Sequence, residues 1–405
     1  MAESRLQIPT GMQDTLPGEC AGRRALEASF RRLFAASGYR EIETPVLEFY
    51  GALDDQTYGY RPEHVWKTFD RVGRVLARRP DSTIPAARLA AGTLANVPLP
   101  LRISYLQSAC KFQSDTLSLL CEQPQAGVEL MGEGGEAADA EVISLAVDCL
   151  RASGLRGWQI ELGHAGFLNG FLREAALTPD QLAAVRELMA CKDTQGIRRA
   201  LAGRVPPETA ERLAALPLLL GGAEVLDEAE RLTADPECRA ATASLRRIVA
   251  LLRAFGCEAT LTFDLAMAQE AGYYSGVIFR AHAAGVGQPV LSGGRYDGLV
   301  ARFGRDLPAV GFALNTKTLL IALEAQGERF APPALDWLVA ADEAHMQAAV
   351  RRAVALRADG ARAALCFGAT REALQERLDR RDAAGAIRIT DQGEEVLTPC
   401  PDTNP

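Results

Sequence analysis

The first part of the chain shows a helical hydrophobic pattern followed by strand-like segments. Between Ala21 and Ser37 the apolar residues recur three and four positions apart, which predicts an amphipathic helix that ends at the Ser37-Gly38 pair. The next residues, YREIETPVLEFYGAL, predict a strand that Pro45 interrupts. The run WKTFDRVGRVLA then predicts a hairpin that turns near Gly73, because glycine tolerates the backbone of a tight turn.

The centre of the chain predicts a strand pair and several helices. Arg102–Gly132 has the pattern of a strand, a loop and a return strand. Residues from about 171 to 256 are rich in Ala, Leu, Arg and Glu without strand-like alternation, which predicts a helical insertion broken by prolines. Outside it we expect helices at Ile84–Ala91 and Ala137–Ser153 and a strand at Trp158–Leu162. The helices expected inside it are Pro179–Ala190, Thr194–Ala202, Pro207–Ala215, Ala223–Thr233 and Cys238–Phe255.

The segment that begins FDLAMAQEAGYYSGVIF combines strand-like, glycine-rich and charged residues. A strand-rich run at Val277–Phe279 precedes a glycine-rich turn at Gly293-Gly294 and an Arg-Tyr-Asp cluster. The apolar segment Ala309–Leu314 is expected to start a helix that continues to Gln326. Glycines placed between a strand and charged or aromatic groups let the backbone come close to a small ligand. The segment therefore predicts a binding site.

The end of the chain predicts a separate small domain. A linker is expected at Phe330–Pro333, after a main domain of residues 1–328, and a small α/β domain is expected over residues 334–405. Its expected elements alternate between strand and helix: Trp337–Ala340, Ala344–Ala358, Ala361–Phe367, Arg371–Arg380 and Ile387–Thr390.

Length and charge narrow the class of protein. A chain of 405 residues is long enough for two or three domains with cores of their own. Its formal net charge is −8 at pH 7, and its sequence contains no block of basic residues. Affinity for nucleic acid depends on Lys and Arg that neutralise phosphates. This composition weighs against tRNA as the main partner.

Cysteine, histidine and hydropathy indicate a cytoplasmic protein without a metal. Nine cysteines include no C-x-x-C pair, and their odd number argues against a full disulfide framework. The four histidines are not paired at metal-ligand spacing, so no zinc site is expected. No apolar run approaches the roughly 18 residues that span a bilayer, and the N-terminus lacks the pattern of a secretory signal.

Several motifs, in order, resemble the catalytic domain of class II histidyl-tRNA synthetases. The similarity runs from Ile8 to about Leu323 and implies an α+β fold with an antiparallel sheet flanked by helices. In that family the segment at YREIETPVLEFYGAL is the first class II motif, which builds a self-dimer. The matching positions are Tyr273, Tyr274, Gly276, Gly293 to Leu299, Gly311, Phe312, Gln125, Gly127 and Glu129.

The resemblance implies a pocket for L-histidine. A carboxylate of the family grips the α-ammonium group of histidine, and Asp81 occupies its position here. An alternative stays open for Asp81, because a carboxylate beside a helix start is also a helix cap. Tyr273 and Tyr274 could likewise be ordinary strand residues, and Arg295 and Asp297 could be a structural pair. The residues expected to bind histidine are Asp81, Thr83, Gln125, Glu129, Tyr273, Tyr274 and Tyr296.

This sequence departs from the family at cationic positions that serve adenylation. A family arginine that holds the α-phosphate of ATP is replaced by Lys111, which lacks the planar fork of arginine. Two further arginines of the same loop fall on Leu119 and Cys121, and another falls on Gln269. The closing Glu-Arg of the third class II motif falls on Lys317-Thr318. Loss of fixed cations removes electrostatic stabilisation that adenylation needs.

The sequence also resembles a second family, the regulatory subunits of ATP phosphoribosyltransferase. Members of that family keep the pocket, lack the adenylation arginines and have a shortened C-terminal domain. This similarity implies a non-catalytic subunit without catalytic residues or cofactor. It also implies a hetero-oligomer, a hetero-octamer in that family, with a short-form catalytic subunit. The complex would carry out the first step of histidine biosynthesis under feedback inhibition by L-histidine. Two alternatives remain: an active histidyl-tRNA synthetase with divergent chemistry, and a synthetase-like scaffold protein that does not bind histidine.

Overall fold

The computed structural model describes residues 6–53, 64–111, 121–257, 261–267 and 272–400. Their contacts form two compact units, and each is described by itself. The first consists of the described parts of Met1–Thr15 and Arg23–Glu328. The second consists of Leu16–Gly22 and the described part of Arg329–Pro405.

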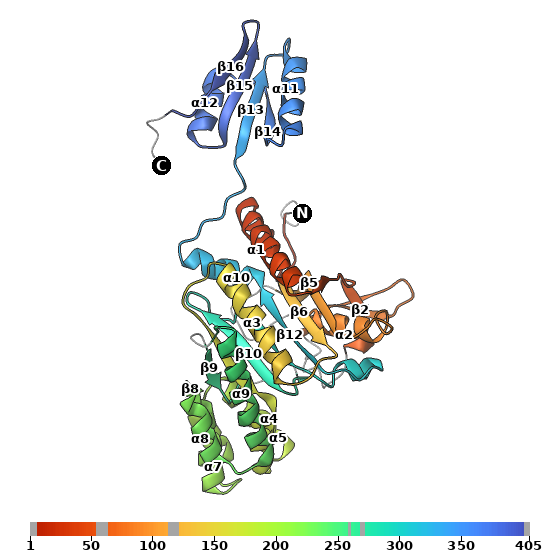
Figure 1. Cartoon of the computed structure of the whole chain (residues 1–405), viewed down its shortest axis with the longest axis vertical. Helices are drawn as coiled ribbons and strands as arrows, with labels where there is room; N and C mark the ends of the chain where they lie inside the picture. The colour runs from red at the N-terminus through yellow and green to blue at the C-terminus, as the bar shows by residue number, and fades with distance from the viewer. Residues whose placement is uncertain (1–5, 54–63, 112–120, 258–260, 268–271, 401–405) are drawn as a thin grey trace. The chain divides into compact units, whose positions relative to one another are not determined.

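A nine-stranded, mainly antiparallel sheet forms the first unit (Figure 1). Two of its strand pairs, β1 with β5 and β7 with β9, are parallel, and the others are antiparallel. This confirms the predicted antiparallel α+β fold. In sheet order the strands are β1 (Arg40–Glu41), β5 (Leu101–Cys110), β6 (Glu122–Met131), β12 (Ala309–Asn315), β11 (Leu291–Arg295), β10 (Val277–Ala283), β7 (Trp158–His164), β9 (Leu261–Asp264) and β8 (Leu220–Gly221).

Helices cover one face of this sheet. The helix α1 (Pro17–Ala36) packs Phe34 edge-on against Phe312 of β12, and Phe312 in turn contacts Phe279 of β10. Figure 1 shows α3 (Glu136–Ala152) crossing the sheet, and its apolar side is fully buried. The helix α10 (Thr316–Ala325) packs beside β6 and β12. Side chains alternate along a strand, so the residues between these core positions face the other side of the sheet.

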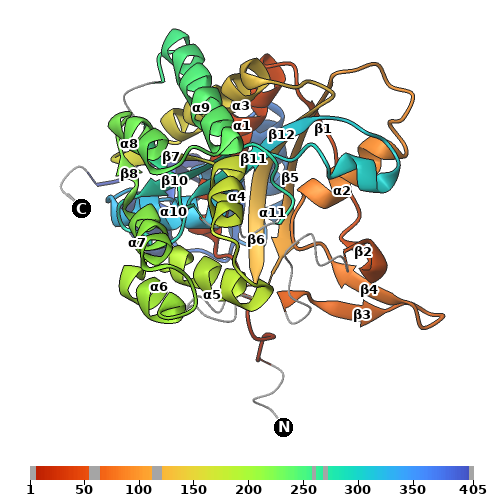
Figure 2. The ribbon, with the colours of Figure 1, turned by 90° about the horizontal axis from the view of Figure 1, so that it is seen from below.

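The two ends of the sheet carry separate substructures (Figure 2). At one end lie α2 (Thr83–Ala91) and a small sheet in the order β2 (Leu47–Phe49), β4 (Val75–Arg78), β3 (Lys67–Phe69). The predicted hairpin is confirmed, since Gly73 has φ +82° in the turn between β3 and β4. At the other end lies the predicted helical insertion. Its helices are α4 (Ala165–Glu174), α5 (Pro179–Ala190), α6 (Thr194–Leu201), α7 (Pro207–Ala215), α8 (Glu224–Leu232) and α9 (Pro236–Ala254).

Two local predictions were wrong, and a third, the strand interrupted at Pro45, was right only in part. The Gly293-Gly294 pair lies within β11 rather than in a turn. Ala309–Leu314 belongs to β12, and the following helix begins only at Thr316. An apolar run without periodicity does not distinguish a buried strand from a helix. The expected strand at 39–53 divides at Pro45 into β1 and β2, which join different sheets, before a short 3-10 helix at Tyr50–Ala52.

The second unit has a small α/β fold, in which a four-stranded sheet has a helix on each face. The strands run in the order β14 (Ala363–Phe367), β13 (Leu335–Ala341), β15 (Ala383–Thr390), β16 (Gly393–Leu397). The helix α12 (Arg371–Asp379) packs on one face through Leu374 and Leu378, and α11 (Met346–Ala358) packs on the other. We propose that the two units are the two domains expected at 1–328 and 334–405.

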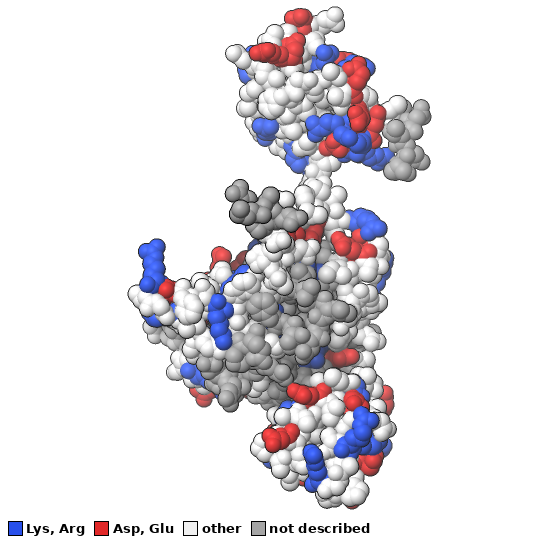
Figure 3. All heavy atoms as spheres, turned by 180° about the vertical axis from the view of Figure 1, so that it is seen from behind, with Lys and Arg blue, Asp and Glu red and all other residues white. Residues whose placement is uncertain are grey.

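Charges of both signs mix on the described surface. On the face shown in Figure 3, Lys and Arg side chains of the helical insertion lie among Asp and Glu side chains. Several arginines of the insertion form ion pairs, such as Arg198 with Glu211 at 3.0 Å and Arg246 with Asp227 at 2.5 Å. The arginines of the insertion are thus partly neutralised by neighbouring carboxylates. None of the helices in the described ranges is long and apolar enough to cross a membrane.

Candidate functional site

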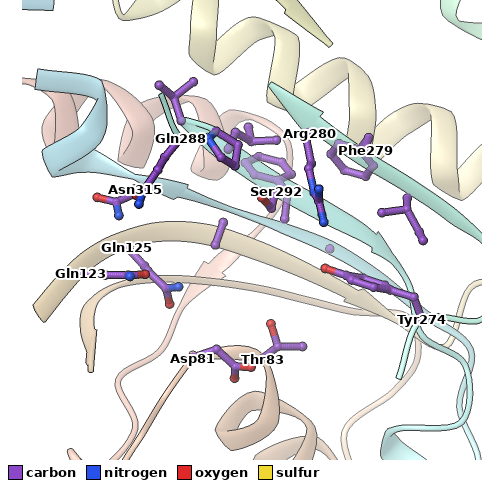
Figure 4. A pocket seen from close by; sticks show the side chains of 18 of the residues that line it. Asp81, Thr83, Gln123, Gln125, Tyr274, Phe279, Arg280, Gln288, Ser292 and Asn315 are labelled. Carbon is purple, nitrogen blue, oxygen red and sulfur yellow. The ribbon is translucent and has the colours of Figure 1, made fainter. Parts of the chain in front are cut away.

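A cavity of about 550 Å³ lies on the face of the large sheet opposite to α1 and α3. Strands β6, β12, β11 and β10 form its floor, and the start of α2 and the segment around Tyr273 form its walls. Figure 4 shows side chains from these separate elements pointing into one space. All the residues expected to bind histidine line it: Asp81, Thr83, Gln125, Glu129, Tyr273, Tyr274 and Tyr296.

Glu129 of β6 is the central buried carboxyl group of the cavity. Its side chain accepts hydrogen bonds from Thr83 Oγ1 at 2.8 Å, from Tyr105 OH at 3.0 Å and from Tyr296 OH. The residue is only 1% exposed, and burial raises the pKa of Glu129 to about 7 although the three hydroxyl groups lower it. A carboxyl group with this pKa can share a proton with an imidazole ring, whose own pKa is about 6.5.

Two glycines make room for this arrangement. A Cβ atom on Gly311 would lie 1.8 Å from Glu129 Oε2, and a Cβ atom on Gly294 would lie 2.8 Å from the ring of Tyr274. Gly311 and Gly294 are direct neighbours across β12 and β11. Gly294 of the Gly-Gly-Arg run therefore allows close packing of a pocket side chain against a strand and does not form a turn.

Asp81 supports the start of α2. Its Oδ1 accepts a hydrogen bond from the Ile84 backbone N at 3.0 Å, and its Oδ2 accepts one from Tyr273 OH at 3.4 Å. Beside it, Ser82 Oγ donates to Gln125 Oε1 at 2.9 Å. The capping alternative is thus present in the structure, while contact with a ligand ammonium group stays a prediction.

Substitution of Asp81 separates these two roles. We expect Asp81→Asn and Asp81→Ala both to weaken L-histidine binding by about 10-fold or more, because each removes the charge that is predicted to face the ammonium group of histidine. Only Asp81→Ala should also lose about 1 kcal/mol of stability, since asparagine keeps an acceptor for the Ile84 N–H. Calorimetric titration and urea unfolding measure the two effects. Normal histidine binding by Asp81→Asn would show that Asp81 caps the helix and does not bind the ligand.

Three tyrosines form an aromatic wall. The ring centroids of Tyr273 and Tyr274 lie 5.1 Å apart, and Tyr273 meets Tyr296 edge-on at 5.8 Å. Tyr273 and Tyr274 lie outside the strands, and both line the cavity, so the ordinary-strand alternative is wrong. The turn after β11 is held by Arg295, which donates to Asp139 at 2.8 Å and to Asp297 at 2.9 Å. Arg295 and Asp297 are the structural pair considered as an alternative.

The positions expected to have lost adenylation cations give a mixed picture. Lys111 lines the cavity. Cys121 is buried and donates through Sγ to Gly11 O at 3.1 Å, while Lys317 Nζ donates to Gln13 Oε1 at 2.8 Å. Cys121, Lys317 and Thr318 are not among the residues that line the cavity. Leu119 and Gln269 lie outside the described residues.

Sequence reasoning missed one part of the cavity. Arg280 of β10, Ser292 of β11 and Asn315 of β12 line it together with Gln123 and Gln288. Their signal in the sequence is alternation, because Arg280 follows buried Ile278 by two positions on a strand. No group of His, Cys, Asp and Glu able to hold a metal ion is found in the part of the chain that the structure describes.

Comparison with known proteins places the chain among two related groups. A sequence model of the family described as histidyl-tRNA synthetase matches residues 11–319. An ATP phosphoribosyltransferase regulatory subunit of Symbiobacterium thermophilum is 42% identical over 88% of this chain and 90% of its own length. One of Acetivibrio thermocellus is 38% identical over 89% of this chain and 86% of its own length.

Solved structures show the same fold. A crystal structure of an ATP phosphoribosyltransferase regulatory subunit/histidyl-tRNA synthetase from Bacillus halodurans superposes with a TM-score of 0.80 at 29% identity. It covers 92% of this chain and 96% of its own. Histidyl-tRNA synthetase from Nostoc superposes with a TM-score of 0.77 over 97% of both chains. At 18% identity the second likeness concerns the fold alone. The predicted class II synthetase-like fold is confirmed.

Proposed function

Because this chain belongs to the family of ATP phosphoribosyltransferase regulatory subunits, which have the histidyl-tRNA synthetase fold, we propose that it binds L-histidine in the cavity and regulates a separate catalytic subunit. The partner is a short-form ATP phosphoribosyltransferase, which needs this chain for activity in the first step of histidine biosynthesis. The complex is a cytoplasmic hetero-oligomer, a hetero-octamer, and histidine inhibits it through this chain. The chain itself catalyses no reaction.

One observation carries the proposal: a buried polar network remains where histidine would bind, while the arginines that serve adenylation in the resembled family are replaced. Glu129 keeps three hydroxyl donors, and their pairing is consistent with a site that recognises a polar ring. Thr318 occupies a position where the resembled family has an arginine, and Lys317 donates a hydrogen bond to Gln13. Each missing transition-state contact is worth roughly 3 to 4 kcal/mol of activation free energy. Losses of that size favour a binding protein over an adenylating enzyme.

Feedback inhibition requires two arrangements of the complex. Histidine must bind more tightly to the inhibited arrangement than to the active one, since equal affinity would shift no population. A coupling free energy of about 1 to 3 kcal/mol, typical of allosteric proteins, corresponds to a change in affinity of about 5- to 150-fold. By reciprocity, a ligand that favours the active arrangement lowers the affinity for histidine by the same factor by which histidine lowers the affinity for that ligand.

Self-association through the first class II motif is part of the proposal. Apolar side chains are exposed on both faces of the small sheet of β2, β4 and β3: Leu47 at 40% and Phe49 at 50% on one face, and Phe69 at 70% on the other. Leu47 and Phe49 are neighbours on their face, and contiguous exposed apolar residues mark interaction surfaces. Their position on the segment that dimerises in the resembled family supports a self-dimer. Sedimentation of the chain as a monomer at micromolar concentration would contradict this part.

The test combines binding with enzyme assays. We expect calorimetric titration of the purified chain with L-histidine to show binding, and titration with ATP to show none. Histidine-dependent exchange of pyrophosphate into ATP should be absent. Added to a short-form catalytic subunit, the chain should raise transferase activity, and histidine should lower it again.

Contrary results point to the other candidates. ATP binding with histidine-dependent pyrophosphate exchange would restore an active synthetase. Failure to bind histidine, both alone and in the presence of the catalytic subunit, would favour a scaffold protein. Neither alternative has a specific contact in the described cavity that favours it.

A further inference from the structure

We propose that Arg280 is the residue that binds the α-carboxylate of the amino acid in the cavity and selects for ligands that carry this group. The inference rests on the proposed histidine site and names the residue that gives this site its specificity for a carboxylate. Figure 4 shows the Arg280 side chain pointing from β10 into the space that also receives Gln125 and Tyr274. Arg280 belongs to none of the synthetase motifs that indicated the pocket, and it lines the cavity directly.

The register of the sheet places Arg280 opposite to the groups expected to hold the rest of histidine. Arg280 pairs with Ser292, Ser292 with Ala313, and Ala313 with Gly127. Ser292 and Ala313 are small, so the row from β10 to β6 has a low floor beside Arg280, and the ring of Tyr105 covers Gly127 at the other end. The row spans three strand spacings, roughly 14 Å. The Arg280 side chain and the amide of Gln125, two residues from Gly127 on β6, reach into the same cavity, where the head group of an amino acid can lie between them.

The chemistry of the walls orients that head group. Asp81 and Gln125 present oxygen atoms, which accept from an ammonium group. Glu129 and the tyrosines form the end that suits an imidazole ring. A carboxylate needs a cation, and of the described residues that line the cavity only Lys111 and Arg280 are cationic.

Arg280 fits this task better than Lys111. A guanidinium group offers five N–H donors in a planar fork, so it can bind a carboxylate through two parallel bonds and still contact the protein. Glu161, the cross-strand neighbour of Arg280 on β7, supplies a negative charge behind it and forms an ion pair with His282 at 3.4 Å. Arg280 also stands on a central strand, whereas Lys111 follows the end of β5.

The test compares L-histidine with L-histidinol, which has a hydroxymethyl group in place of the carboxylate. We expect the wild-type chain to bind histidine about 10- to 100-fold more tightly than histidinol, the range for charge-assisted hydrogen bonds. Arg280→Met should lower histidine affinity to that of histidinol and leave histidinol affinity within about threefold of wild type. Arg280→Lys keeps the charge beside Glu161 and should retain part of the preference. If Arg280→Met does not fold, Arg280→Lys serves as the test variant in its place.

The outcomes separate this inference from the proposed function. A preference for histidine that survives in Arg280→Met, or that Lys111→Met abolishes instead, would overturn the assignment of Arg280 and leave the histidine site intact. Absence of histidine binding by the wild-type chain, alone and with its catalytic partner, would overturn the site and this inference with it. Equal affinity of the wild-type chain for histidine and histidinol would show that no cation reads the carboxylate.

Discussion

Gly311→Ala is expected to destabilise the main unit by about 3 kcal/mol or more and to abolish histidine binding. The new Cβ atom would lie 1.8 Å from Glu129 Oε2 and 2.5 Å from the backbone oxygen of Val128. A side-chain rotation could relieve the first contact, but the second involves the neighbouring strand β6, which is paired through its whole length. Overpacking of this kind costs about 1 to 3 kcal/mol, and more where the backbone must shift.

Urea unfolding monitored by circular dichroism measures the change in stability, and titration with L-histidine measures the loss of binding. Gly298→Ala is the matched control. A Cβ atom at Gly298 would meet no heavy atom within 4 Å, and we expect it to behave as wild type. Normal stability and normal binding of Gly311→Ala would show that Glu129 does not occupy the position described.

Glu129→Gln is expected to weaken L-histidine binding by about 10- to 100-fold while the protein stays folded. A carboxylate has about four acceptor sites, and three hydroxyl groups occupy three of them. The amide of glutamine keeps the shape but offers a single acceptor oxygen, and its NH₂ group faces a hydroxyl group or the ligand. The imidazole ring would lose the charged partner with which it shares a proton.

The same variant should change the pH dependence of stability. The pKa of Glu129 is raised to about 7 in the folded chain by burial, against an ordinary value of 4.5. The folded state therefore holds a proton that the unfolded state releases between these pH values. The contribution of Glu129 to the free energy of unfolding falls as pH rises from about 4.5 to about 7. Glutamine does not titrate, so this fall should be absent in Glu129→Gln.

Urea unfolding across that pH range, with calorimetric titration at pH 7, measures both effects. Glu133→Gln is a suitable control, because Glu133 is exposed and lies outside the cavity. A pH profile of stability that is unchanged in Glu129→Gln would contradict the raised pKa. Undiminished histidine affinity would remove Glu129 from the ligand site and leave it with a structural role.

The sequence by itself determined the motifs of the site and most of the helices. Hydrophobic periodicity is local, so α3 and the helices α5 to α9 of the insertion followed from spacing, while α4 was not predicted. The hairpin at Gly73 followed from the turn preference of glycine. The order of motifs such as Gln125 to Glu129 and Gly293 to Leu299 was enough to identify the family and to select seven residues that line one cavity.

Only the tertiary structure decided which strands pair and which face each side chain occupies. Ala309–Leu314 is apolar throughout, and the neighbours on both sides, β6 and β11, make it a strand. Gly293 and Gly294 resembled a turn because the physical reason for them, close packing of Gly293 against Phe312 and of Gly294 against Tyr274, is absent from their local sequence. Arg280 joins the site through the register of three strand pairs, and a shift of one residue would turn it to the opposite face. Alternation along β10 shows which residues share a face, but it does not show which strands pair with β10 or which residues they bring to that face.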